Sequence, residues 1–340
     1  MNQTERLLAA LRRQPLDRPP VICPGGMMSV ATVEAMDLCG CHWPAAHHDL
    51  DQMVRLALTV HDEGGLENLA VPFCMTVEAE ALGAEVDFGD RLTQPRVIRE
   101  PFAPSRELLA SDLSPIAQSP RAQIVLQAMR QLRAARPDAP LLGNLVGPVS
   151  LVASLVQPDR FFKEMIREPQ SVREALERVT DLLVAFGREQ IGTGADVMVI
   201  ADPTATGEIV GPRLFEQLVL PPLSRLIHSL REAGPPVILH VCGNLLTLAP
   251  LLRHTGADCL SVDAVVNLRR LRQRLPHMPL MGNLDALVLE AGPPERIARW
   301  THKTGLPAAD IIAPACAVVP TTPLSHLRAL AQAARDGVEK

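Results

Sequence analysis

The chain has 340 residues, of which 47% are hydrophobic and 21% charged, which is enough for one large α/β domain or two smaller ones. Lys and Arg number 33 against 38 Asp and Glu, so no net positive charge draws the chain to nucleic acid. With 7 Phe, 2 Trp and no Tyr, the chain has too few aromatic rings for a surface that stacks nucleobases or sugars.

The N-terminal segment and the cysteines bear on the cellular compartment. Residues 1–20 are polar and then amphipathic, without the apolar core and small-residue cleavage site of a signal peptide. No apolar run approaches the ~20 residues that cross a bilayer. The 7 cysteines lack the dense, regular spacing of a secreted disulfide scaffold. We therefore expect a cytoplasmic protein with reduced thiols and no membrane partner.

Short apolar runs followed by longer helical patterns recur along the chain. Eight runs have the pattern of strands, at 20–24, 68–74, 140–146, 196–202, 236–242, 258–263, 279–284 and 310–316. Helical patterns cover 49–67, 121–136, 171–193, 213–233, 245–254 and 322–336. Eight repeats of strand then helix predict a closed (β/α)8 TIM barrel, an α/β fold that takes up residues 1–340 as a single domain.

A doubly wound open sheet is the main competing fold. Its nucleotide-binding form needs a Gly-rich fingerprint after the first strand, and Gly25 and Gly26 alone do not supply one. Residues 85–120 interrupt the strand-helix repeat, because they are polar and broken by proline. We expect this stretch to form a β-containing loop or insertion at the barrel mouth, without a helix of its own.

The predicted strand ends carry three residues that bind soft metal ions. His240 and Cys242 end the fifth run and Cys316 ends the eighth, and active sites of such barrels lie at the C-terminal ends of the strands. Two thiolates and one imidazole with an open fourth position form a recurrent catalytic zinc set. The alternative is core packing, with a satisfied buried histidine and two cysteines acting as small hydrophobes. The strand-end position of all three residues favours zinc.

Three acidic residues lie near the same predicted strand ends. Asp263 ends the sixth run and would be a fourth ligand or a partner of a ligand. Asp202 ends the fourth run and would either bind substrate or cap the following turn. Glu78 follows the second run and is a further candidate, with a solvated or capping role as its alternative.

Several longer stretches match one family nearly end to end. They include ERLLAALRRQPLDRPPVICPGGMM, VPFCMTVEAEALGAEVDFG, ADPTATGEIVGPRLFEQLVLPPL, ILHVCGN and IIAPACAVVPTTPLSHLRAL. In these stretches the chain resembles the uroporphyrinogen decarboxylase superfamily, and specifically its methylcobamide:coenzyme M methyltransferase branch. The resemblance implies a TIM barrel and a zinc ion held by His240, Cys242 and Cys316. The decarboxylase itself uses an arginine after the first strand and an aspartate near the second. Residues 23–28 and 72–75 contain neither, which disfavours porphyrinogen decarboxylation.

The resemblance also implies a reaction. Zinc would deprotonate an acceptor thiol, coenzyme M (2-mercaptoethanesulfonate) before others, and the zinc thiolate would attack the methyl group of a methyl-Co(III) corrinoid. A separate corrinoid protein would carry the donor. Because aromatic rings are scarce, Met27, Met28 and Met75 are expected to contact the corrinoid, with Glu78 and Asp202 as further candidates. Another thiol or tetrahydrofolate as acceptor, and a zinc- and corrinoid-binding barrel without turnover, are the alternatives.

Overall fold

A computed structural model describes residues 1–337 and contains a parallel sheet at its centre. The sheet has the strand order β1 (Leu69–Ala70), β4 (Leu141–Val146), β5 (Val197–Ala201), β6 (Val237–Val241), β7 (Cys259–Val262) and β8 (Leu280–Met281). Except for Ala70, every residue of these strands is buried. Because both faces of the sheet are covered, the strands have nearly continuous apolar sequences instead of alternating ones.

The first and eighth predicted runs close this sheet into a barrel. Val21 of the first run forms a parallel bridge with Ile312 of the eighth, and β8 bridges Ile311. The backbone N–H of Glu67 donates to the carbonyl of Val21 at 2.9 Å, which joins the first run to the segment leading into β1. Prolines at 20, 24 and 314 prevent longer ladders because proline has no N–H to donate. The predicted (β/α)8 barrel is confirmed.

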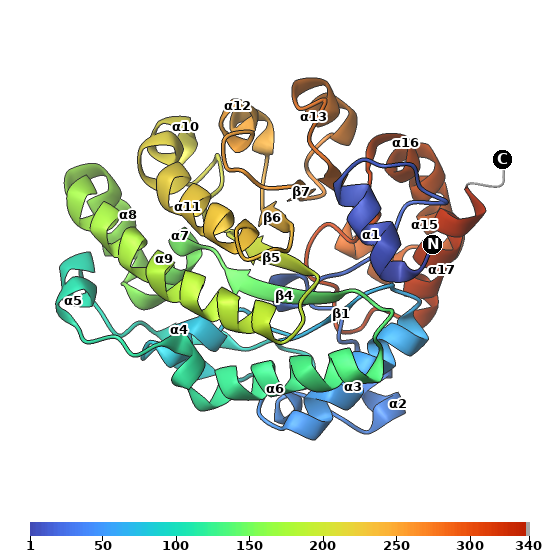
Figure 1. Cartoon of the computed structure of the whole chain (residues 1–340), viewed down its shortest axis with the longest axis horizontal. Helices are drawn as coiled ribbons and strands as arrows, with labels where there is room; N and C mark the ends of the chain where they lie inside the picture. Colours follow the sequence, from blue (N-terminus) through green and yellow to red (C-terminus); the bar gives the residue numbers. More distant parts are fainter. Residues whose placement is uncertain (338–340) are drawn as a thin grey trace.

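Helices surround the barrel, with α3, α6, α9 and α11 around the strands in Figure 1. The helices are α1 (Gln3–Leu11), α2 (Val33–Cys39), α3 (Leu50–Gly64), α4 (Val77–Ala81), α5 (Ser105–Ala110), α6 (Pro120–Ala135), α7 (Pro148–Leu155), α8 (Pro158–Arg167), α9 (Pro169–Gly192), α10 (Gly211–Leu214), α11 (Leu220–Arg231), α12 (Ala249–Leu252), α13 (Leu268–Arg274), α14 (Ala286–Ala291), α15 (Pro294–Trp300), α16 (Leu306–Ala308) and α17 (Leu324–Asp336). Within residues 1–337, none of them combines the length and apolar character needed to cross a membrane.

Two predicted helices are broken into shorter pieces. In place of one helix over 213–233, α10 leads through a π-helical turn, Phe215–Val219, into α11. In place of one helix over 245–254, a 3-10 turn, Leu245–Thr247, precedes α12. Prolines at 221, 222 and 250 lie at the starts of α11 and α12, where a missing N–H costs little. Helical periodicity therefore located these segments without showing where each helix restarts.

The stretch 85–120 differs in part from its prediction. Strands β2 (Glu85–Asp87) and β3 (Arg96–Arg99) form an antiparallel hairpin, so the expected β structure is confirmed. The expectation that the stretch has no helix is wrong, because it contains α5 and a 3-10 turn, Ile116–Gln118. Helix α5 is held by tertiary contacts: Leu108 is fully buried, and the Ser105 N–H donates to Glu164 Oε2 at 3.0 Å. A helix this short depends on packing more than on its own sequence.

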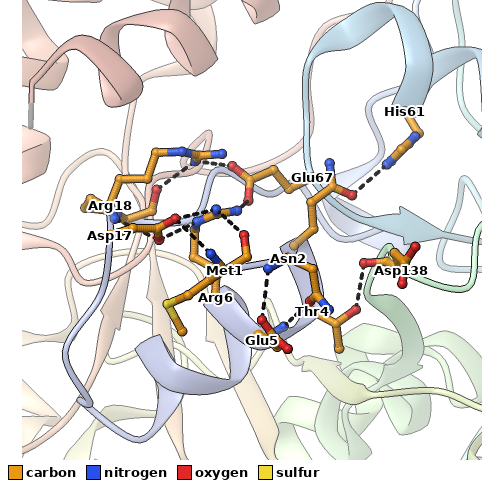
Figure 2. A network of polar contacts seen from close by, with 12 residues as sticks. Met1, Asn2, Thr4, Glu5, Arg6, Asp17, Arg18, His61, Glu67 and Asp138 are labelled. Carbon is orange, nitrogen blue, oxygen red and sulfur yellow. Dashed lines mark hydrogen bonds and ion pairs between the residues drawn. The ribbon is translucent and has the colours of Figure 1, made fainter.

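An ion-pair network fastens α1 to the base of the barrel (Figure 2). Arg6, buried in this network, donates to Asp17 Oδ2 at 2.7 Å and to Glu67 Oε2 at 2.9 Å. Arg18 forms a second ion pair with Glu67. Because Glu67 also bonds Val21, the network ties α1 to the beginnings of two barrel strands. The opposite face, where the strands end, is the side on which barrels of this kind bind their ligands.

Candidate metal centre

His240, Cys242 and Cys316 meet where their strands end. His240 is the penultimate residue of β6, Cys242 follows β6 directly, and Cys316 ends the eighth run. One ligand atom from each residue, an imidazole nitrogen or Sγ, lies within 4.8 Å of the other two. His240 is completely buried, whereas both cysteines are partly exposed. The group is therefore anchored in the core through its imidazole and accessible through its sulfurs.

Ser261 on the neighbouring strand orients the imidazole of His240. The two residues are paired in the β6–β7 register, and Ser261 Oγ lies 3.0 Å from His240 Nδ1. The same hydroxyl donates to Met28 Sδ at 3.6 Å, so its oxygen accepts from Nδ1–H. This network assigns the tautomer and leaves the Nε2 lone pair facing Cys242 Sγ, 3.4 Å away. A fixed imidazole with a free nitrogen is what a metal ligand requires.

The pKa values of the two thiols, Cys242 and Cys316, are shifted in opposite directions. The pKa of Cys316 is lowered, chiefly because the Cys242 thiol donates a hydrogen bond to its sulfur. The pKa of Cys242 is raised by that same contact with Cys316 and by burial. Two cysteine sulfurs and one imidazole nitrogen are a donor set that suits Zn²⁺, with a fourth position left for an incoming ligand. The residues present thus fit a catalytic zinc ion.

Asp263 lies beside His240, Cys242 and Cys316, the candidate metal ligands that we call the metal-binding group, without belonging to it. Its Oδ2 accepts the N–H of Gly243 at 3.1 Å, and its Oδ1 accepts the N–H of Val265 at 3.2 Å. Both carboxylate oxygens are therefore engaged with backbone at the mouth. In this arrangement Asp263 fixes the turn that follows Cys242, and its role as a fourth ligand stays a prediction.

Asp202 caps a helix across the strand ends. Its Oδ1 accepts from Ser150 Oγ at 2.6 Å and from the Ser150 N–H at 2.8 Å, and its Oδ2 accepts from the Val149 N–H at 3.1 Å. These donors belong to the first turn of α7. Burial raises the pKa of Asp202 while these hydrogen bonds oppose the shift. The carboxyl therefore caps α7, the helix after the preceding strand, and not the turn that follows it in sequence.

Glu78 belongs to a small pocket beside the metal-binding group. The pocket is lined by Met27, Met75, Glu78 and Asn144 with the ends of β4 and β5. Met27 connects it to the group, because its Sδ lies 3.9 Å from Cys242 Sγ. Glu78 is 3% exposed, so a solvated role is excluded, and its Oε1 accepts the N–H of Val146 at 3.0 Å. Burial raises the pKa of Glu78 to about 7.

Of the three methionines expected to contact a corrinoid, only two face this pocket. Met27 and Met75 line it and are partly exposed. Met28 is buried, with its sulfur accepting from Ser261 and its carbonyl accepting from the Cys23 thiol at 2.7 Å. Met28 therefore contacts Ser261, the residue that orients the His240 imidazole, and does not line the pocket.

Comparison with models of known families shows which family the chain belongs to. Residues 2–337 match the model of the family described as Uroporphyrinogen decarboxylase (URO-D). The chain belongs to the uroporphyrinogen decarboxylase family. Relatives with similar sequences include proteins named as methyltransferases and proteins named as decarboxylases.

Relatives with similar sequences include methyltransferases of Methanosarcina species. Methylcobamide:CoM methyltransferase MtbA of Methanosarcina acetivorans is 31% identical over 334 residues, which cover 98% of this chain and 97% of that protein. Methylated-thiol–coenzyme M methyltransferase of Methanosarcina mazei is 30% identical and covers 99% of this chain and 90% of that protein. A solved methyltransferase structure from Methanosarcina mazei superposes with a TM-score of 0.93 at 31% identity, covering 100% of both chains.

Arg121 is a buried cation near the site that strand-end reasoning missed. It lies in the first turn of α6, is 4% exposed, and donates to Thr76 Oγ1 at 2.8 Å and to Cys74 Sγ at 3.6 Å. It also forms an ion pair with Glu80 at 2.5 Å. Cys74 lines the same pocket as Glu78. Because Arg121 comes from a helix start and not from a strand end, only tertiary structure reveals that it reaches the mouth.

Proposed function

We propose that this member of the uroporphyrinogen decarboxylase family is a zinc-dependent methyltransferase, with residues 1–340 forming one domain. It would move a methyl group from a methyl-Co(III) corrinoid to a thiol, with coenzyme M as the preferred acceptor. The convergence of His240, Cys242 and Cys316 at the mouth carries the proposal. The names of the two methyltransferase relatives described above support the donor and the acceptor.

His240, Cys242 and Cys316 would hold the metal ion. When bound, zinc would lower the pKa of the acceptor thiol and keep the thiolate in place. Ser261 keeps Nε2 of His240 free for the ion, and Asp263 fixes the backbone after Cys242. Two thiolate ligands already balance the charge of a divalent ion, so an added acceptor thiolate keeps its negative charge and its nucleophilicity.

The donor and the acceptor are the only two reactants of the transfer step, and its bonds and electrons balance between them. The acceptor sulfur attacks the methyl carbon, a C–S bond forms, and the Co–C bond breaks with its electron pair left on cobalt. The products are a methyl thioether and Co(I), so the corrinoid is reduced by two electrons as the methyl group leaves. The proton of the acceptor thiol is released before attack. In this proposal the donor arrives on a separate corrinoid protein.

The alternatives differ in acceptor or in reaction. Acceptor identity is tested by anaerobic assays with methylcobalamin and a panel made of coenzyme M, other small thiols and tetrahydrofolate. The highest kcat/KM with coenzyme M would support the proposal, and transfer to tetrahydrofolate alone would overturn the thiol acceptor. Porphyrinogen decarboxylation would appear as zinc-independent CO₂ release from an acidic tetrapyrrole. It is disfavoured because residues 23–28 and 72–75 contain neither the arginine nor the aspartate that the decarboxylase uses.

A further inference from the structure

Glu78 is a buried acid that lies near the metal-binding group without an ion-pair partner of its own. It belongs to the first turn of α4 and is 3% exposed. Its Oε1 accepts the backbone N–H of Val146, the last residue of β4, at 3.0 Å. Within residues 1–337, no side chain hydrogen-bonds to Glu78 and no cation forms an ion pair with it. Its negative charge is therefore poorly compensated.

The hydrogen bond from Val146 does not require an acid. A glutamine would accept the same N–H through its amide oxygen and would carry no charge. Arg121 is the cation whose charge reaches Glu78, but it is already paired with Glu80 and donates to Thr76 Oγ1 at 2.8 Å. A buried ionisable side chain that the fold does not need as an acid indicates a role in chemistry.

The small pocket described above connects this buried carboxyl to the metal-binding group. Val146 is paired with Ala201 on β5, and Ala201 is paired with His240 on β6. Neighbouring strands lie ~4.8 Å apart, so Val146 and His240 are about 10 Å apart across the sheet. Ala201 and Met27 line the pocket, and Met27 Sδ lies 3.9 Å from Cys242 Sγ. The pocket therefore extends from the carboxyl toward the side of the group on which Cys242 lies.

The size and lining of the pocket suit a single water molecule. Its volume is about 10 Å³, close to the minimum that holds one water. Besides Glu78, Asn144 offers its amide oxygen, because its Nδ2 already donates to the carbonyls of Val71 at 3.3 Å and Leu142 at 3.4 Å. Two polar partners are enough to hold a water in place. A water in this pocket would link the carboxyl to a thiol bound at the metal-binding group.

The groups around Glu78 place its pKa near neutral pH. Burial is the largest influence and raises the pKa of Glu78 to about 7. The Cys74 thiol, when ionised, acts in the same direction and Arg121 opposes it. Apart from Cys74 and Glu78, no residue that lines the pocket is titratable. A base is most effective when its pKa lies near the working pH, because it is then ionised and still binds a proton well.

We propose that Glu78 accepts the proton of the thiol acceptor through a water molecule in this pocket. The S–H bond of the acceptor breaks, its proton passes to the water, and the water passes a proton to the carboxylate of Glu78. The acceptor is left as a thiolate beside Cys242 and Cys316. Glu78 returns the proton to solvent after the methyl thioether leaves. The inference rests on the proposed function, because it assigns a destination to the proton that the acceptor loses.

The test compares acceptors whose thiols differ in acidity. Methyl transfer from free methylcobalamin is measured with coenzyme M and with trifluoroethanethiol, whose fluorines make its S–H more acidic. The variants are Glu78→Gln and, as the matched control, Glu164→Gln. Glu164 is also a buried carboxylate that accepts a backbone N–H, from Ser105 at 3.0 Å, but it lies on α8 at the outer edge of the molecule (Figure 1). Each variant is first checked for native circular dichroism and one bound zinc ion.

Glu78→Gln is expected to lower kcat/KM about 100-fold with coenzyme M and less than tenfold with trifluoroethanethiol, because the more acidic thiol depends less on a base. In the native chain, kcat/KM for coenzyme M should fall as pH drops below about 7, where Glu78 becomes protonated. Glu164→Gln should match the native chain within twofold with both thiols. Losses of equal size with the two thiols, or native rates in Glu78→Gln, would overturn the role of Glu78.

A second measurement needs no turnover. Infrared difference spectra are recorded near pH 8 as coenzyme M is added to the zinc-loaded chain without a corrinoid. The carbonyl band of a protonated carboxyl should grow in the native chain and in Glu164→Gln but not in Glu78→Gln, because the bound thiolate favours the neutral form of a nearby acid. No growth in the native chain, or the same change in all three chains, would overturn the inference. Failure of the proposed function would show separately, as absence of methyl transfer by the native chain with either thiol.

Discussion

Ser261 Oγ lies 3.0 Å from His240 Nδ1, on the side of the imidazole away from Cys242. The contact links two adjacent strands and holds the ring in the tautomer that exposes Nε2 to a metal ion. Ser261→Ala is expected to weaken zinc affinity about 10- to 100-fold, the usual effect of losing such a partner. Competition with a chromogenic chelator measures the change. Ser105→Ala is the control, because Ser105 is equally buried and its hydroxyl has no hydrogen-bond partner within residues 1–337.

Removing a ligand is expected to remove zinc and activity together. Cys316→Ala and His240→Ala each delete one of three converging ligands, so zinc measured by mass spectrometry should fall below one ion per chain. Cys259→Ala is the matched control, since Cys259 is a fully buried cysteine at the other end of β7. Full zinc content in both ligand variants would mean that the metal is bound elsewhere.

Because Glu78 is buried, we expect the free energy of unfolding to depend on pH. Burial raises its pKa from 4.5 to about 7, so the folded chain binds a proton that the unfolded chain has already released. The free energy of unfolding should therefore fall as pH rises from about 4.5 to about 7, by roughly 3 kcal/mol at ~1.4 kcal/mol per pKa unit, and then level off. Glu78→Gln keeps an oxygen for the Val146 N–H and cannot ionise.

Urea unfolding of the native chain and Glu78→Gln at several pH values measures this effect. The variant should gain stability relative to the native chain as pH rises through that window, with the full difference reached near pH 8. Parallel stability curves for the two proteins would show that Glu78 ionises normally in the fold.

Because Asp202 caps α7, we expect a substitution that keeps its shape but changes its hydrogen bonding to lower the free energy of unfolding. Asp202→Asn turns an acceptor of three hydrogen bonds into a group with an NH₂ that faces donors of α7. The free energy of unfolding should fall by about 1–3 kcal/mol, as for an unsatisfied buried polar group. Asp181→Asn removes only an exposed ion pair with Arg225 and should cost less than about 1 kcal/mol. Equal losses in the two variants would argue against the cap.

The barrel and the convergence of His240, Cys242 and Cys316 could be predicted from local sequence because both follow from strand positions. Periodicity located the strands, and their C-terminal residues were already the site candidates. The residues that contact and orient these ligands could not be predicted. Ser261 lies 21 residues from His240 and 233 from Met28, and only the strand register brings them together. The contact of Arg121 with Cys74 could not be predicted for the same reason, because the two residues are 47 positions apart in the sequence.

The alternative that Asp202 caps the turn that follows it shows how residue order can mislead. Its carboxyl instead caps α7, more than 50 residues earlier in the chain. Parallel strands place their ends side by side, so an acid can cap the helix of a neighbouring unit as easily as its own. Likewise, α5 was missed because its stability comes from packing against the core and not from a visible period.

The most direct test of the account is an anaerobic assay of the zinc-loaded chain with methylcobalamin and 2-mercaptoethanesulfonate. Cob(I)alamin is followed by its absorbance and the methyl thioether by mass spectrometry. We expect the two products in equal amounts, at a rate that falls at least 100-fold after zinc removal and returns when zinc is restored. No zinc-dependent demethylation with any thiol would contradict the assignment of this chain as a corrinoid-dependent methyltransferase.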